Sequence, residues 1–232
     1  MRNKIFILLI LSIFINCGIK KPNTYDNYKS YMIARGEDPK AKRPFKHFED
    51  FLSYKDSIKK QDLINNQILK VNKVYIYYSE TKTITFGTFI EEGVQSVTFV
   101  IYSDEGFFCL STFDLNKNSF TAPENGIIKL KKSVIVEDFG EFEITNDFIK
   151  TSKRNKTPFK EWYDHVNGNI KNDVIHFTEG YIGKEYKFEK KWYALKKKFD
   201  FKQVYQPNLK AVKYKSKSGL TCFEVTGEFS VK

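Results

Sequence analysis

The sequence has few of the residues from which catalytic and metal sites are built. Its 232 residues include three histidines, three cysteines and two methionines. It contains no G-x-S-x-G, P-loop, H-E-x-x-H, C-x-x-C or dinucleotide-binding motif. We therefore expect no cofactor and no metal ion, and no motif nominates a reaction.

Arginine is scarce, although the chain is basic. Lysine and arginine total 39 against 28 acidic residues, a net charge of +11, yet only four of the 39 are arginines. The lysines are scattered over what the pattern predicts to be outer faces of strands, as on a solvated surface. We therefore expect no nucleic-acid partner. Attraction to anionic lipid headgroups or envelope polymers is the functional alternative.

No apolar run is long enough to form a stable membrane span. The N-terminal run, Ile5–Ile15, would measure roughly 16 Å as a helix at ~1.5 Å per residue, against a hydrocarbon core of ~30 Å. Arg2 and Lys4 precede the run, and Cys17 follows it directly after Asn16. A charged start followed by a short apolar run predicts a secretory signal peptide over residues 1–16.

The tetrapeptide Phe14-Ile15-Asn16-Cys17 resembles the lipobox of bacterial lipoproteins, in a relaxed form. The resemblance implies that the Cys17 thiol carries acyl chains such as palmitate and that cleavage before it leaves a mature chain anchored in the cell envelope. Because Gly18 follows Cys17 and no acidic residue comes soon after, it also implies an outer membrane facing the periplasm. Location at the cell surface is the alternative. An ordinary signal peptide with a coincidental cysteine is the alternative to lipidation.

The rest of the chain predicts one globular domain, 45–232, behind a tether over 17–44. Hydrophobic residues make up 41% and aromatic residues 16% of the sequence, too apolar for a disordered chain. Alternating apolar residues predict strands at 71–78, 83–90, 94–102, 107–113, 126–136, 181–190, 210–215 and 220–231. We expect a mainly β (α+β) fold, an antiparallel meander forming a barrel-like or sandwich sheet with two or three short helices.

Helical spacing predicts three short helices. The tether contains the first, from Thr24 to Gly36, and the second runs over 45–60, packing onto a sheet, plugging a barrel end, or binding a partner or membrane surface. The third starts at Thr157-Pro158 and places Phe159, Trp162, Tyr163 and Val166 at i, i+3, i+4 and i+7. It is either a lid packed over the sheet or the lining of a ligand mouth. Helix and strand both fit 188–199, which contains Trp192. The candidate ligand-lining residues are Trp162, Tyr163, Phe159 and Trp192.

The pattern I-x-N-D-x-I occurs twice, at 144–149 and at 170–175. Asn and Asp tolerate left-handed backbone angles, so each copy predicts a tight hairpin with its isoleucines on one buried face. The Asp104-Glu105-Gly106 segment predicts a third hairpin. The repeated pattern is similar to that of small, uncharacterised envelope lipoproteins with β-meander or lipocalin-like bodies, which implies a fold of that kind.

Cys109 and Cys222 remain once Cys17 carries lipid. Exported proteins form disulfides, so the two could pair, but both lie in strand-like runs and could equally be small buried hydrophobic residues. The one catalytic-looking cluster is Glu161, Asp164 and His165. Adjacent residues of a strand point to opposite faces, and no motif supplies a nucleophile.

Three hypotheses follow for the function. The first is a non-enzymatic envelope lipoprotein that binds a hydrophobic or envelope-derived ligand or a protein partner. The second is a structural or assembly-accessory lipoprotein without a pocket, and the third is a hydrolase that uses Asp164 and His165. A closed barrel with an apolar cavity of ~300 Å³ or more would favour a ligand, whereas a filled core would favour a partner surface.

Overall fold

A computed structural model of the chain describes residues 30–36, 38, 48–85, 88–116, 118–183, 196–217 and 219–230. The lipobox, Cys17 and Trp192 lie outside these residues. The described chain contains a short helical segment over 30–34, the helix α3 (Phe48–Asn65) and twelve strands. The strands are β1 (Val74–Thr85), β2 (Thr88–Tyr102), β3 (Phe107–Asp114), β4 (Ile127–Lys129), β5 (Val134–Val136), β6 (Asp138–Thr145), β7 (Phe148–Lys156), β8 (Glu161–Lys171), β9 (Val174–Gly183), β10 (Lys196–Tyr205), β11 (Leu209–Lys215) and β12 (Thr221–Ser230).

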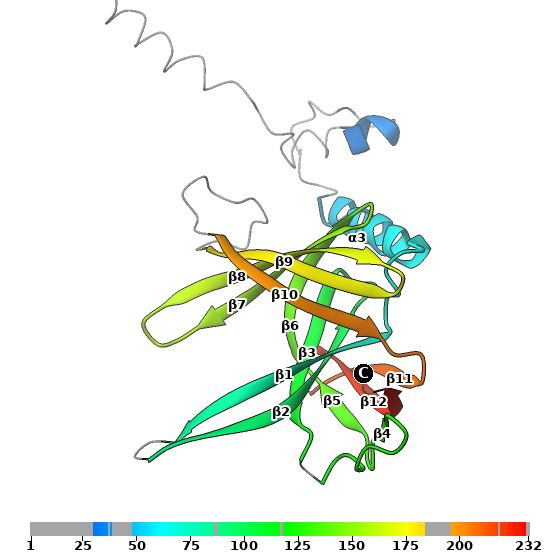
Figure 1. Cartoon of the computed structure of the whole chain (residues 1–232). Helices are drawn as coiled ribbons and strands as arrows, with labels where there is room; N and C mark the ends of the chain where they lie inside the picture. The colour runs from blue at the N-terminus through cyan, green and yellow to red at the C-terminus, as the bar shows by residue number, and fades with distance from the viewer. Residues whose placement is uncertain are drawn as a thin grey trace, which may run out of the picture. The chain divides into compact units, whose positions relative to one another are not determined.

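Eight strands close into an antiparallel barrel (Figure 1). Its order, β1-β10-β9-β8-β7-β6-β3-β2, follows the chain, with β4 and β5 inserted between β3 and β6. Closure comes from β1 and β10, which pair Tyr75 with Tyr205. The mainly β meander is therefore confirmed, and of the two expected sheet forms the barrel is the one observed.

Tight turns make the sequential strands antiparallel neighbours. Asn146 and Asn172 adopt φ angles of 56° and 50° at the β6–β7 and β8–β9 turns, in the left-handed region that Asn tolerates. The isoleucines beside each turn face each other, Ile144 with Ile149 and Ile170 with Ile175. The third expected hairpin, β2–β3, turns through Gly106 at a φ of 85°. All three hairpins are confirmed.

The barrel wall is buried on both sides along β1 and β2. Val74 and Ile76 of β1 belong to one hydrophobic cluster, whereas Tyr75 and Tyr77 pack in another. Because successive side chains of a strand point to opposite faces, these are an outer and an inner core. Burial on both faces explains why this part of the sequence reads as a continuous apolar run.

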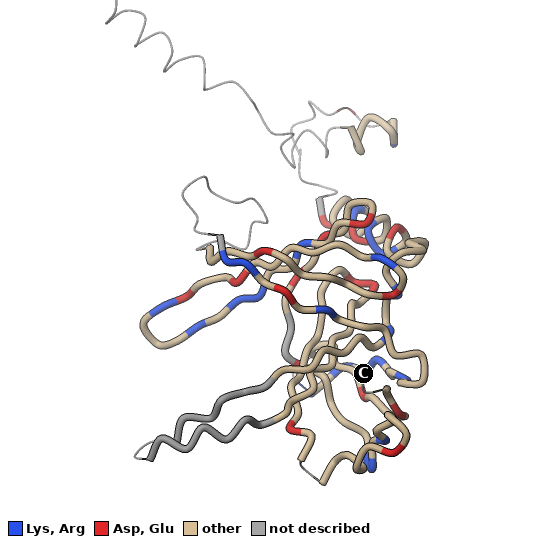
Figure 2. Tube along the Cα trace, viewed as in Figure 1, with Lys and Arg blue, Asp and Glu red and all other residues tan. Residues whose placement is uncertain are grey.

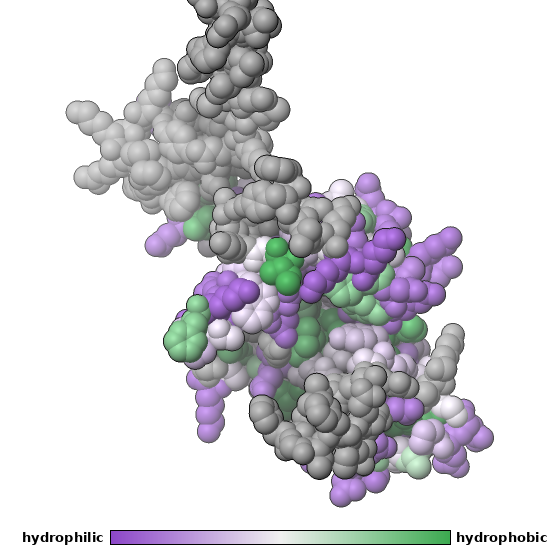
Figure 3. Space-filling view, turned by 60° about the vertical axis from the view of Figure 1, so that its left-hand side comes forward, coloured by the Kyte–Doolittle hydropathy of each residue, from purple (hydrophilic) through white to green (hydrophobic). Residues whose placement is uncertain are grey.

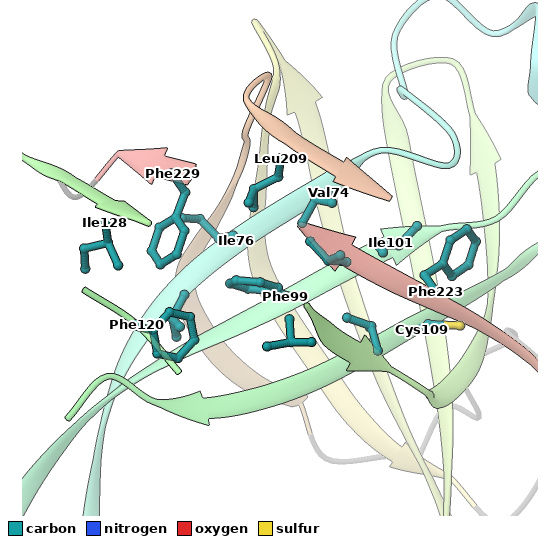
Figure 4. Close-up of a cluster of buried hydrophobic side chains, with 14 residues drawn as sticks. Val74, Ile76, Phe99, Ile101, Cys109, Phe120, Ile128, Leu209, Phe223 and Phe229 are labelled. Carbon is teal, nitrogen blue, oxygen red and sulfur yellow. The ribbon is translucent and has the colours of Figure 1, made fainter. Parts of the chain in front are cut away.

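A second sheet forms the outer core with the barrel wall (Figure 4). Its order is β11-β12-β4, and β5 also pairs with β12. Phe223 and Phe229 of β12 pack in one cluster with Phe99 and Ile101 of β2 and with Cys109 of β3. The closing hairpin expected over 210–231 is therefore confirmed, and its role is to cover the outer face of β1–β3.

One end of the barrel is closed by the end of α3 and the loop after it. Leu63 and Leu69 are 5% and 1% exposed and pack in the inner core. Asn66 holds the loop, because its side-chain oxygen accepts hydrogen bonds from the amides of Ile68 and Leu69 at 2.8 and 2.9 Å. The helix expected over 45–60 is thus present from Phe48 and ends at Asn65, and its last turn packs Leu63 into this end of the inner core.

The helix expected from Thr157 is wrong, because this segment is a hairpin loop followed by β8. Thr157 accepts a hydrogen bond from the Lys160 amide at 3.1 Å, and Pro158 follows it in the loop. A hydroxyl residue followed by proline can begin a helix or a β-turn, so the signal was ambiguous. The aromatic residues that followed suit a strand equally well.

Other strand bounds also differ from the expectation. The segments 71–78 and 83–90 were separated at a polar stretch, but β1 runs through it to Thr85 and pairs with the long β2. The strand expected over 126–136 is two short strands that pair with different parts of β12. The helical alternative for 188–199 is wrong from Lys196 onward, where β10 begins.

The chain divides into two units, Met1–Ser57 and Ile58–Lys232, with the boundary inside α3. In the first unit a short helix over 30–34 is followed by a turn at Arg35 and Gly36, where the φ of Gly36 is 72°, and Met32 packs with Phe51. The helix expected to end at Gly36 is confirmed for these residues.

Among the described helices, none combines the length and apolarity that crossing a membrane requires.

Candidate functional site

The candidate site is a cavity of about 140 Å³ inside the barrel. Seven of the eight barrel strands contribute to its wall, and the eighth, β6, does not. The lining residues are Tyr77, Val100, Leu110, Thr151, Lys153, Asp164, Val166, Phe177, Phe201 and Gln203. Side chains from strands far apart in the sequence thus converge on one space because the barrel closes.

Most of the wall is apolar. Phe177 and Phe201 stack with ring centroids 5.0 Å apart, and the rings of Tyr77 and Phe201 lie 5.2 Å apart. Val100 and Leu110 continue this surface across β2 and β3. Such a wall gains free energy from contact with an apolar group in place of water.

The polar groups deep in the lumen satisfy one another. Tyr102 donates a hydrogen bond of 2.8 Å to the side-chain oxygen of Gln203, and Thr151 donates one of 3.1 Å to the Val166 carbonyl. Burial raises the pKa of Tyr102 well above its usual value, and the nearby Tyr75 and Tyr77 add to the effect. The phenol therefore stays neutral and acts as a hydrogen-bond donor.

Charged groups mark the end of the cavity away from Leu63 and Leu69. Lys153 and Asp164 line it there, both only half-buried, so this end meets solvent. Asn155 donates a hydrogen bond of 2.7 Å to Asp164. On the face with the β7–β8 hairpin, Figure 3 shows hydrophobic side chains recessed among hydrophilic ones. We call this end the mouth, defined by Lys153, Asn155 and Asp164.

The aromatic residues expected to line a ligand site do not form the cavity wall. Trp162 lies two residues before Asp164 on the same strand face, half-buried, with the Lys160 ammonium 5.5 Å from its ring centroid. Tyr163 is on the opposite face, and Phe159 is 99% exposed in the β7–β8 loop. Only Trp162 therefore borders the mouth, and Trp192 lies outside the described residues.

The residues of the catalytic-looking cluster are separated. Asp164 lines the lumen, whereas His165 points outward, is 2% exposed and stacks on Tyr181 with centroids 4.6 Å apart. Glu161 is exposed and forms an ion pair with Arg154 at 2.7 Å. Adjacent strand residues face opposite sides, so a joint role of Asp164 and His165 at one reacting atom has no geometric support.

The remaining histidines and cysteines do not build a site either. His176 of β9 contacts Asp200 at 2.7 Å on the surface, and it pairs with Asn169, not with His165. In the part of the chain that the structure describes, no three His, Cys, Asp or Glu residues gather as metal ligands would. Cys109 and Cys222 are buried thiols without a disulfide between them, so the buried-hydrophobe alternative is the one observed.

Of the lining residues, only Val166, in the expected helix, and Asp164, in the catalytic-looking cluster, were named from the sequence. Each lining residue belongs to an ordinary alternating strand, in which inward and outward positions look alike when both faces are buried. A usable signal was the pair of charged residues, Lys153 and Asp164, at inward-facing positions. No protein-family model matches the chain, and neither a curated protein nor a solved structure is significantly similar to it.

Proposed function

We propose that this chain is a lipid-anchored, non-enzymatic protein of the bacterial cell envelope whose barrel binds a small amphipathic ligand. The lipobox-like segment ending at Cys17 supports the anchor and an outer-membrane, periplasm-facing location. The observation that carries the binding proposal is the apolar cavity of about 140 Å³ that ends in charged groups at one side. The apolar part of the ligand occupies the lumen, and its polar part stays at the mouth.

The size of the cavity limits the ligand. An apolar protein cavity of ~150 Å³ holds a molecule the size of benzene. The lumen therefore takes about six carbons of an alkyl chain, and a longer chain would extend through the mouth. Drug-sized ligands occupy pockets of ~300 Å³ or more and are too large.

The charge at the mouth favours an anionic head group. Lys153 and Asp164 oppose each other there, and Arg154 pairs with Glu161, which leaves the exposed Lys156 and Lys160 as the neighbouring excess of positive charge. A carboxylate at the mouth would meet the positive field of these lysines. The proposed ligand class is therefore a medium-chain alkyl carboxylate or a lipid fragment with the same chemistry.

A protein-binding or assembly role is the second candidate, and the small volume of the cavity favours it. At about 140 Å³ the cavity is below the ~300 Å³ that typical ligand pockets reach. In that case the lumen is packing space, and function resides on the surface.

Calorimetric titration of the full chain with alkyl carboxylates from butyrate to decanoate separates the two candidates. Each buried methylene is worth ~0.8 kcal/mol, so affinity should rise about fourfold per carbon and stop rising near six carbons. The corresponding alkyl amines should bind more weakly.

Two matched substitutions provide the control. Val166→Phe adds volume to the lumen and should abolish the dependence on chain length, whereas Val212→Phe changes a residue that is 62% exposed on β11 and should leave it intact. Thermal unfolding of both variants shows whether they fold. If Val166→Phe does not fold, Leu110→Phe replaces it as the variant that fills the lumen. Affinity that is independent of chain length in the unsubstituted protein would rule out lumen binding.

A further inference from the structure

The tip of the β7–β8 hairpin presents one large apolar side chain to solvent. Phe159 is 99% exposed, the highest value of any large hydrophobic residue that the structure describes. The loop around it is held shut, because Thr157 donates its amide to the Lys160 carbonyl at 2.7 Å and accepts the Lys160 amide at 3.1 Å. Phe159 thus lies exposed on an ordered turn. Full burial of such a side chain would stabilise the protein by roughly 1.5–3 kcal/mol, and Phe159 does not contribute this free energy.

Basic residues surround this tip. Residues 150–161 contain five basic side chains and one acidic side chain, Glu161, which pairs with Arg154. Four of the basic residues lie on β7 and the fifth, Lys160, lies in the loop, and Figure 2 shows basic residues again at the start of β10, where Lys197 and Lys198 are exposed. The tip therefore combines an apolar point with an uncompensated positive charge.

Trp162 lies just behind the tip, half-buried, with Lys160 over its ring. Tryptophan is enriched at membrane–water interfaces, where its ring contacts the boundary between acyl chains and headgroups. Lysine is depleted at protein–protein interfaces but is attracted to anionic lipid surfaces. A single apolar residue beside lysines therefore suits a lipid bilayer better than a protein partner, because a protein–protein interface would need a wider apolar core.

We propose that the β7–β8 tip docks on an anionic lipid bilayer, with Phe159 inserted at the interface and Lys156 and Lys160 contacting lipid headgroups. Because β7 and β8 also carry Lys153 and Asp164, docking turns the mouth of the barrel toward the membrane. The contact is separate from the acyl anchor and does not require a ligand in the lumen.

An environment-sensitive fluorophore on Phe159→Cys tests the insertion in the full chain. Cys17→Ser in the background removes acylation and labelling at that position, and Cys109 and Cys222 are 0% and 2% exposed, so the label goes to residue 159. Val212→Cys, on the second sheet, is the matched control. With vesicles of phosphatidylcholine and phosphatidylglycerol in equal amounts, the label at 159 should brighten and shift to the blue, while the label at 212 should not.

Charge variants test the second half of the proposal. Lys156→Gln with Lys160→Gln should weaken the response at 159 roughly 30-fold in lipid concentration, since each lysine near an anionic surface contributes a factor of about five. Lys131→Gln with Lys132→Gln makes the same charge change between β4 and β5 and should have little effect. The proposal would be overturned if the labels at 159 and 212 responded equally to anionic vesicles, if the label at 159 responded equally to phosphatidylcholine alone, or if it responded only to added envelope protein. A failure to bind alkyl carboxylates in the lumen would not affect this proposal.

Discussion

The isoleucines beside the two Asn-Asp turns serve the fold from inside the barrel. Ile149, Ile170 and Ile175 are at most 3% exposed and pack in the inner core, while Ile144 is half-buried against the same cluster. The asparagines of the turns are exposed and contribute only a left-handed backbone angle. The two residue types should therefore differ in their effect on stability.

Replacing Ile149, Ile170 or Ile175 with Ala should lower the free energy of unfolding by roughly 2–5 kcal/mol, the cost of a buried cavity. Ile144→Ala should cost less, since its side chain is half-buried. Asn146→Ala or Asn172→Ala should cost about 1 kcal/mol, because only a turn preference is lost. Urea titration of each variant measures these changes. A large loss at the asparagines without one at the isoleucines would indicate that the turns bind a ligand.

At the scale of elements, an ion cluster fastens the second sheet to the barrel. Lys213 of β11 contacts Asp104 at 2.7 Å and Glu105 at 2.6 Å, both in the β2–β3 turn, and Lys60 at the end of α3 lies 3.5 Å from Asp104. Burial alone would raise the pKa of Asp104, but hydrogen bonding and the charge of Lys213, with Asn72 and Lys60, lower it below its usual value. The pKa of Glu105 is also lowered from its usual value, against the same burial effect and mainly by Lys213.

Lys213→Met should destabilise the protein by about 1–2 kcal/mol at neutral pH, a value reduced by partial solvent exposure of the cluster. A carboxylate with a lowered pKa stabilises the fold above its unfolded pKa and loses this contribution as the pH falls through its folded pKa. The stability difference between the unsubstituted protein and Lys213→Met should therefore be constant near neutrality and shrink below about pH 4.

Chemical denaturation across this pH range, with Lys210→Met as the control, measures the effect. Lys210 is an exposed residue on the same strand, so its loss should change stability little at any pH. A difference for Lys213→Met that persists undiminished in acid would mean that packing of the lysine stem, and not its charge, holds the sheet.

At the scale of the whole molecule, the anchor proposal predicts the fate of a single-residue variant. Cys17→Ala should move the protein from the membrane fraction to the soluble fraction. Two or three acyl chains, at ~0.8 kcal/mol per buried methylene, contribute far more free energy of membrane binding than the β7–β8 tip does. Cys222→Ala, which alters a buried thiol, should leave the partition unchanged. Membrane partition of Cys17→Ala equal to that of the native chain would end the lipoprotein proposal.

Sequence signals near each turn were sufficient to predict which consecutive strands of the barrel pair as hairpins. Alternating apolar residues on both sides of Asp104-Glu105-Gly106 and of the two Asn-Asp pairs predicted hairpins that the structure contains, because strand and turn are then set by residues within a few positions of one another. The same locality explains the error at Thr157-Pro158, since a helix start and a β-turn share that signal. The lipobox interpretation of residues 14–17 also rests on local sequence, and it stays a proposal.

Long-range pairing decided the rest. Whether the meander closed into a barrel depended on β1 meeting β10, Tyr75 beside Tyr205, and no local pattern encodes a contact over that separation. The cavity exists because closure brings Val100, Val166 and Phe201 together, and the ion pair of Lys213 with Asp104 exists because the second sheet covers the barrel. A strand with two buried faces does not reveal which face becomes the lumen. Hence the strands and turns were determined by the sequence near them, whereas the lumen, its mouth and the exposed position of Phe159 were decided by tertiary structure.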